Sequence, residues 1–135
     1  MLNLLDTSAL LAHYRGEKGA ERVQAIFAEE DEQVLIASVS IPELARRLRD
    51  LGVDGTRIRQ VVGEYLGLAH SVVAVDATVA ETSDEILCAT PSRLPLVDAL
   101  IAASARVTGA RLVHRDSHMR AIPAALLQQL DLDAE

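Results

Sequence analysis

The stretch LNLLDTSALLAHY, residues 2–14, holds the features that decide the fold. Its first four residues are a largely apolar run that is too short for a helix, which predicts a buried strand over residues 2–5. Asp6 follows directly, and the pattern after it predicts a helix over residues 7–14. Asp is favoured at helix N-caps, because its carboxylate accepts hydrogen bonds from the free N–H groups of the first turn. On this stretch alone, Asp6 is best interpreted as a helix cap.

Strand and helix patterns alternate along the rest of the chain. Strands are expected at VLIAS (34–38), SVVAV (71–75), ARLVH (110–114) and, as an edge strand, LLQQLDL (126–132). Helices are expected over 19–30, 40–52, 54–68 and 95–109, with another from the end of SVVAV to Ala89. Such alternation predicts a mostly parallel sheet of four to five strands with helices on both faces. We therefore expect a single α/β domain over residues 1–135, in which the continuous apolar runs at 2–5, 35–37 and 72–75 are fully buried.

The composition fits one globular domain with an aliphatic core. Half of the residues are apolar but only 2% are aromatic, which argues against recognition of single-stranded nucleic acid by stacking. The single cysteine, Cys88, excludes an internal disulfide and is expected to be a buried apolar residue in a reducing compartment. The sequence shows no secretory signal and no apolar stretch of about 18 residues, so we expect a soluble, cytoplasmic protein.

The net charge of −7 opposes nucleic-acid binding, which usually requires a basic surface. The acids are unevenly spread, however, because many lie in AEEDEQ (28–33) and in the C-terminal DLDAE (131–135). Both segments are expected to be solvated. The charge therefore lowers the expectation of a nucleic-acid ligand without excluding it.

Four acids lie at positions that a parallel sheet can bring to one edge. In open parallel sheets, ligands bind at the carboxyl ends of the strands. Asp6 directly follows the first predicted strand, and Asp116 follows the fourth by one residue. Glu43 and Asp98 lie in the first turns of predicted helices. Considered alone, Asp6 and Asp116 have a structural alternative as helix caps.

The two helical acids differ in how well a structural role accounts for them. Glu43 has two such roles, a capping box with Ser40 and an i,i+4 ion pair with Arg47. Asp98 lies in a helix that Pro95 opens and that is apolar nearly all round, which predicts burial. A buried charge is paired or binds a metal ion, and this helix offers no nearby cation. We therefore expect a group from elsewhere in the fold to meet Asp98.

Four carboxylates at one edge suit a hard divalent cation such as Mg²⁺ or Mn²⁺. Cations held in this way activate water against a phosphodiester and stabilise the leaving oxygen. Other chemistries fit less well, because the chain has no Gly-rich phosphate loop, no zinc-ligand spacing and no G-x-S-x-G motif. His114 and His118 flank Asp116 at an i,i+4 spacing, and we interpret them first as surface residues.

The segments LDTSALLA, SIPEL, PLVDALIAASA and LVHRDSHM together resemble PIN-domain ribonucleases, in particular VapC-type toxins of bacterial toxin–antitoxin pairs. The resemblance covers essentially the whole chain. It implies a Mg²⁺- or Mn²⁺-dependent endoribonuclease whose catalytic and metal-binding residues are Asp6, Glu43, Asp98 and Asp116. The last motif of the family often has Thr or Ser two residues before its Asp and a second acid two residues after it. Here these positions are His114 and His118, which leaves the binding of a second metal ion open.

The resemblance also implies partners: an RNA substrate, a small antitoxin protein and a second copy of the chain in a homodimer, with no membrane. Four arginines near the predicted edge are candidates for phosphate contacts, although each fits equally well as a solvated residue: Arg15, Arg46, Arg93 and Arg115. Two alternative functions remain open. One is a catalytically idle PIN-fold binding partner, and the other is a Mg²⁺-dependent phosphatase, for which a phosphate-binding loop is missing.

Overall fold

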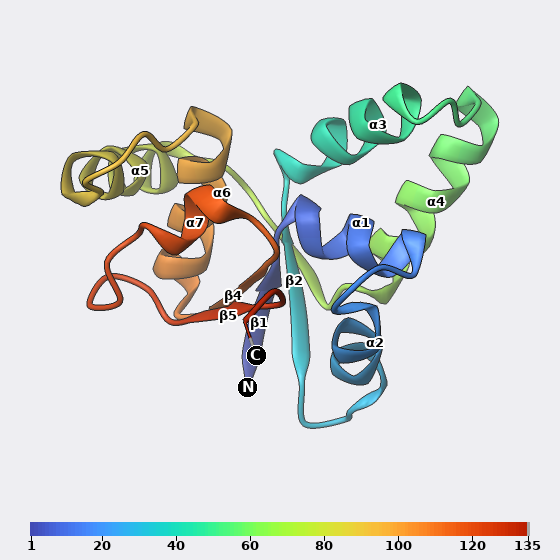
Figure 1. Cartoon of the computed structure of the whole chain (residues 1–135), viewed down its shortest axis with the longest axis horizontal. Coiled ribbons are helices and arrows are strands. Elements are labelled where there is room, and N and C mark those ends of the chain that lie inside the picture. Colours follow the sequence, from blue (N-terminus) through green and yellow to red (C-terminus); the bar gives the residue numbers. More distant parts are fainter. Residues whose placement is uncertain (135) are drawn as a thin grey trace.

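The computed structural model describes residues 1–134, and its centre is a five-stranded parallel sheet (Figure 1). The strands, in sheet order, are β3 (Ser71–Val73), β2 (Gln33–Ala37), β1 (Leu2–Leu5), β4 (Arg111–His114) and β5 (Gln129–Asp131). The helices are α1 (Thr7–Arg15), α2 (Ala20–Ala28), α3 (Ser40–Asp50), α4 (Gly55–Leu68), α5 (Ala77–Ala89), α6 (Leu96–Thr108) and α7 (Ser117–Arg120). The prediction of an α/β fold with a parallel sheet is confirmed.

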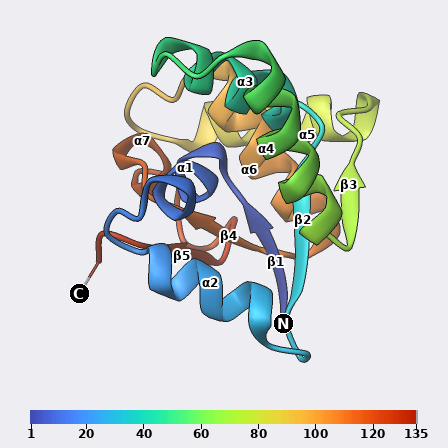
Figure 2. The same ribbon diagram turned by 90° about the vertical axis from the view of Figure 1, so that its right-hand side faces the viewer.

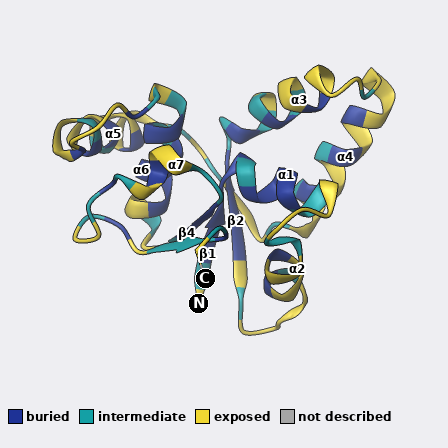
Figure 3. Cartoon of the chain, viewed as in Figure 1, coloured by how far each residue is buried: buried dark blue, intermediate teal, exposed yellow. Residues whose placement is uncertain are grey.

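The helices form a layer on each face of the sheet. Helices α1 to α4 cover one face, and α5, α6 and α7 cover the other (Figure 1). Successive residues of β1 alternate between the layers, because Leu4 packs in the core with α5 and α6, and Leu5 packs with α1 to α4. Figure 3 shows the buried residues gathered where helices face the sheet. Within residues 1–134, no helix has the length and hydropathy that crossing a membrane requires.

The order of the strands places β1 in the middle of the sheet. The chain adds β2 and β3 on one side of β1, and then returns to add β4 and β5 on the other (Figure 2). Such a reversal of winding leaves a crevice at the carboxyl ends of the central strands. The N–H of Asp6 donates to the carbonyl of Val113 in β4 at 2.9 Å, so β1 and β4 stay joined up to this edge.

Two predictions of burial are wrong. SVVAV was expected to be buried, but β3 is short and Val72 is 42% exposed, because β3 is an edge strand that pairs only with β2. Cys88 was expected in the core but is exposed. Helix α5 buries Val79, Ser83 and Ile86, which share one face. Cys88 follows Ile86 by two residues and therefore lies on the other side of the helix.

The predicted capping box at the start of α3 does not form. Val39, rather than Ser40, is the N-cap residue, and α3 has no side-chain cap hydrogen bond. Ser40 is instead the first helical residue, and its buried Oγ atom has no hydrogen-bond partner. Glu43 is therefore not held by the predicted cap.

The acidic C-terminal segment was predicted to be solvated, but two of its acids form ion pairs. Asp133 accepts a hydrogen bond from Arg115 Nε at 2.9 Å, and Asp131 is ion-paired with Arg120. These pairs lower the pKa values of both Asp131 and Asp133, although burial opposes the effect at Asp131. The segment therefore ties β5 to the loop that follows β4.

Candidate active site

Asp6 is fixed at the carboxyl end of β1 and leaves one oxygen without a partner. It is the N-cap of α1, as predicted, and its Oδ2 atom accepts hydrogen bonds from both the N–H and the hydroxyl of Ser8. The Ser8 Oγ atom in turn accepts the N–H of Arg115 at 2.9 Å, which links α1 to the segment after β4. Asp6 is only 2% exposed, and its Oδ1 atom has no hydrogen-bond partner among residues 1–134.

Asp116 is positioned by His114, the last residue of β4, two residues before it. Its N–H donates to His114 Nδ1 at 3.1 Å, and His114 Nε2 lies 2.7 Å from Gln129 Oε1 in β5. His114 thus has an Nε2–H tautomer that accepts on Nδ1. It is fully buried, which lowers its pKa, so the expectation of a surface histidine is wrong. Asp116 itself caps α7 by accepting the N–H of His118 at 2.8 Å.

Asp98 lies in the first turn of α6 and is buried, as predicted, with 8% exposed. Its pKa is raised to about 8, first by burial and then by the negative charges of Asp116, Asp6 and Glu43. The pKa of Asp6 is raised to about 6, chiefly by burial; the hydrogen bonds from Ser8 oppose this rise, and Glu43 and Asp116 add to it. The four predicted acids therefore lie close enough to repel one another.

His118 is the group that meets Asp98. Its Nδ1 atom lies 3.1 Å from Asp116 Oδ1 and 3.9 Å from Asp98 Oδ2. One oxygen from each of these two acids and one nitrogen of His118 lie within 4.8 Å of each other. Its side chain is 51% exposed, as expected of a surface histidine, but that interpretation missed its place in the cluster. The spacing of two residues after Asp116 was the signal that could have found it.

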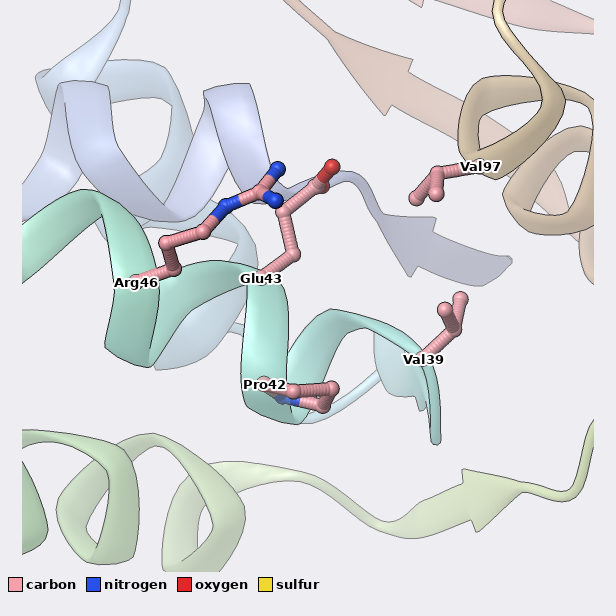
Figure 4. Close-up of a pocket in the computed structure, with 5 residues that line it drawn as sticks. All are labelled: Val39, Pro42, Glu43, Arg46 and Val97. Atoms are coloured by element: carbon pink, nitrogen blue, oxygen red, sulfur yellow. The ribbon is translucent and has the colours of Figure 1, made fainter.

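A pocket of about 180 Å³ lies beside these acids, between the N-terminal turns of α3 and α6. It is lined by Val39, Pro42, Glu43, Arg46 and Val97. Figure 4 shows Glu43 and Arg46 extending side by side from α3, with Val97 across from them. The pocket is therefore lined by a carboxylate of the predicted site, a guanidinium group and apolar side chains.

The four candidate arginines fall into two groups. Arg46 lines the pocket with Glu43, and Arg93 is exposed in the loop between α5 and α6. Arg15 and Arg115 instead line a second, polar pocket of about 300 Å³. Both are already ion-paired with Glu17, at 3.8 and 3.6 Å. Arg46 and Arg93 are thus the freer candidates for substrate contacts.

The residues at this edge fit a divalent cation. Within residues 1–134, the buried side-chain oxygens that lack a hydrogen-bond partner belong to Asp6, Thr7 and Ser40, all within three residues of a predicted acid. A buried carboxylate oxygen without a donor is costly, and a cation would stabilise it. The donor set of carboxylates with one imidazole belongs to Mg²⁺, Mn²⁺ or a later first-row cation.

Comparisons with known proteins agree with this fold. The family model of the PIN domain matches residues 4–125. The solved structure of VapBC2 from Rickettsia felis bound to a promoter DNA fragment matches with a TM-score of 0.76 and 17% identity, covering 97% of this chain and 98% of that chain. DNA-bound VapBC from Salmonella typhimurium matches with a TM-score of 0.74 and 21% identity, covering 98% and 99%.

Mycobacterium tuberculosis VapC20, described as a toxin that cleaves the sarcin-ricin loop, matches with a TM-score of 0.67 and 21% identity, covering 88% of this chain and 93% of that chain. No curated protein gives a significant match. The likeness to these structures establishes the fold, and the family model covers most of the sequence. The chain belongs to the PIN-domain family.

Proposed function

We propose that the chain is a metal-dependent endoribonuclease and the toxin component of a type II toxin–antitoxin pair. The observation that carries this proposal is the convergence of Asp6, Glu43, Asp98 and Asp116 at one edge of a PIN-domain sheet. Burial and the neighbouring acids raise the pKa values of Asp98 and Asp6, an arrangement that suits a bound cation better than it suits the stability of the metal-free fold. VapC20, which shares the fold, is described as a toxin that cleaves the sarcin-ricin loop.

Each residue at the edge has a part in this proposal. Asp6 and Asp116 are held at the ends of β1 and β4 by Ser8 and His114, so their oxygens are preorganised as ligands. Asp98 brings a carboxylate from α6. Mg²⁺ or Mn²⁺, when bound, would activate a water molecule and stabilise the charge on the leaving oxygen. Arg46 is placed to hold an RNA phosphate beside Glu43.

The proposed partners follow from the charge and from the structural relatives. An acidic edge in a protein of net charge −7 suits a small antitoxin with a basic segment, and the Rickettsia and Salmonella relatives were solved as VapBC complexes. We propose that two copies of the chain pair, so that Arg46 and Arg93 of both copies flank one RNA-binding groove. Co-purification from the native host tests the first part, and recovery of the chain alone, harmless and at full yield, counts against it.

Cleavage of a labelled RNA in Mg²⁺, Mn²⁺, Ca²⁺ or EDTA tests the activity. We expect cleavage with Mg²⁺ or Mn²⁺, none with EDTA, and none with Ca²⁺ because of its looser coordination. Asp98→Asn should reduce the rate by about 100-fold or more, the scale of losing a preorganised charged group. The matched control is Asp84→Asn, an exposed acid on α5 that should cleave like the wild type.

Two outcomes decide against the proposal. Equal cleavage in excess EDTA removes the metal-dependent mechanism. Absence of cleavage, together with absence of metal binding in a titration, supports the idle binding partner instead. Binding of metal without hydrolysis of RNA, but with hydrolysis of a phosphate monoester, favours the phosphatase.

A further inference from the structure

His118 lies where its imidazole can either pair with the acids or share a cation with them. Its Nδ1 atom faces Asp116 Oδ1 at 3.1 Å and Asp98 Oδ2 at 3.9 Å. The short turn of α7 fixes this arrangement, because Asp116 Oδ1 also accepts the N–H of His118 at 2.8 Å. The imidazole is therefore held beside the acids by local backbone structure.

The distances match those between ligands of one ion. For a metal–ligand distance of about 2.1 Å, adjacent octahedral ligands lie about 3 Å apart and opposite ones about 4.2 Å apart. The Nδ1 distances of 3.1 and 3.9 Å lie within this span, so modest adjustment of the ring would complete the geometry. The side chain is 51% exposed, and little packing opposes that adjustment.

The unpartnered oxygen of Asp6 is an independent indication that a cation binds beside these acids. Asp6 is 2% exposed, it interacts electrostatically with Asp98 and Asp116, and its Oδ1 atom has no partner within residues 1–134. An imidazole that served only as the counter-charge of Asp116 would leave that buried oxygen unsatisfied. Asp98, Asp116 and His118 already place one ligand atom each within 4.8 Å of one another, and a cation held there would satisfy the Asp6 oxygen if Asp6 also reached it.

We propose that His118 is a metal ligand that makes this site prefer Mn²⁺ or a later first-row cation over Mg²⁺. The inference rests on the proposed metal site and refines it. Imidazole nitrogen is a good ligand for the later cations, whereas Mg²⁺ strongly favours oxygen and keeps its water. The identity of the preferred ion thus follows from one side chain.

Metal titration of four proteins, the wild type, His118→Ala, His118→Asp and His70→Gln, tests the proposal by calorimetry without RNA. His118→Ala should lose about tenfold or more in Mn²⁺ affinity, at least the scale of losing a supporting group, with little change for Mg²⁺. His118→Asp should narrow the preference by strengthening Mg²⁺ binding. His70→Gln removes an exposed histidine at the amino end of β2 while keeping an acceptor for Val34 N–H, and should match the wild type.

Pulsed electron paramagnetic resonance of bound Mn²⁺ supplies a direct readout. We expect modulation by a directly coordinated imidazole nitrogen in the wild type and in His70→Gln, and its loss in His118→Ala. If His118 is only an ion-pair partner, its removal should instead strengthen the binding of both cations, because a competing positive group is gone. That result, or a wild-type spectrum without nitrogen coupling, overturns the role of His118.

The same measurements distinguish a failure of the proposed metal site from a failure of the role given to His118. If the wild type binds neither Mn²⁺ nor Mg²⁺, or binds them as tightly after Asp98→Asn, the metal site itself is wrong and the inference falls with it. If binding depends on Asp98 but not on His118, only the present inference is overturned.

Discussion

Strands β1 and β4 carry buried polar groups at both of their ends, and the two ends are built differently. At the amino end, Asn3 is fully buried, and both the nitrogen and the oxygen of its side-chain amide are hydrogen-bonded. Its Nδ2 donates to Glu32 Oε2 at 3.0 Å, and its Oδ1 accepts from Arg111 Nε and Nη2 at 2.9 and 2.7 Å. Arg111 also lies 3.8 Å from Glu32, so acid, amide and guanidinium form one satisfied network.

At the carboxyl end of the same strands, the acids have no such match. Burial, and then the negative charges of Asp116, Asp6 and Glu43, raise the pKa of Asp98. Within residues 1–134, the basic side chain paired with Asp98 is the exposed His118, 3.9 Å away and charged only when protonated. A satisfied network stabilises the fold, whereas gathered carboxylates cost stability until a cation arrives. The contrast separates the end of the sheet that supports folding from the end that carries the candidate metal site.

The largest change in stability is expected at the amino end. Arg111→Met should lower the free energy of unfolding by about 3 kcal/mol, because it leaves Asn3 Oδ1 buried without a donor and takes from Glu32 one of its two cations, the other being the N-terminal ammonium group. Thermal melting should fall by roughly 10 °C, with or without Mn²⁺. Arg22→Met, at an exposed site on α2, is the control and should stay within about 0.5 kcal/mol of wild type. A variant that melts like the wild type would show that the network contributes little.

At the carboxyl end, we expect the free energy of unfolding to fall as the pH rises, whereas an acid in an ordinary ion pair stabilises the fold as the pH rises. Because the pKa values of Asp98 and Asp6 are raised to about 8 and about 6, the folded state binds more protons than the unfolded state between pH 4 and 8. Stability in EDTA should therefore fall as the pH rises through this range. Each unit of pKa corresponds to about 1.4 kcal/mol, but relaxation of the charged site and the lowered pKa of buried His114 both oppose the trend, so we expect a net loss of roughly 2 kcal/mol.

Denaturant unfolding at a series of pH values measures this loss. Asp98→Asn should make the free energy of unfolding less dependent on pH. Arg111→Met should lower the free energy of unfolding at every pH and leave its dependence on pH unchanged. A wild-type profile that rises from pH 5 to 8 would contradict the raised pKa values.

The smallest effect is expected for Ser8. Ser8→Ala removes the hydroxyl that donates to Asp6 Oδ2 and accepts the N–H of Arg115, and should cost about 1 kcal/mol. The loss should also raise the pKa of Asp6 further, because hydrogen bonds to the charged form are removed. Carboxyl titration by nuclear magnetic resonance in EDTA measures this shift. Ser92→Ala, in the exposed loop before α6, should leave the pKa of Asp6 unchanged.

Much of the fold could be predicted because its signals are local. The apolar run before Asp6 and the capping acids at residues 6 and 116 specify strand ends and helix starts within a few residues. The burial of β3 could not be predicted, since SVV has the same apolar pattern in a central or an edge strand. The exposure of Cys88 likewise depends on which face of α5 meets α6.

The candidate site was predictable only in part, for the same reason. Asp98 could be singled out because its own helix offers it no cation, and its burial followed. The two histidines around Asp116 look alike in sequence. Which of them is buried depends on Gln129, fifteen residues beyond His114 in β5, and which meets Asp98 depends on the packing of α7 against α6. These are tertiary contacts that spacing along the chain does not encode.

The most direct test of the account is the melting of wild type and Asp98→Asn, each in EDTA and in Mn²⁺. We predict that the metal-free variant melts at the same temperature as the wild type or higher, because Asn cannot take on the negative charge that burial and the neighbouring acids penalise at this position. Mn²⁺ should raise the melting temperature of the wild type and should raise that of the variant much less, since stabilisation follows occupancy. A metal-free variant destabilised by about 3–5 kcal/mol, as expected for breaking a buried ion pair, with an unchanged response to Mn²⁺, would contradict the site.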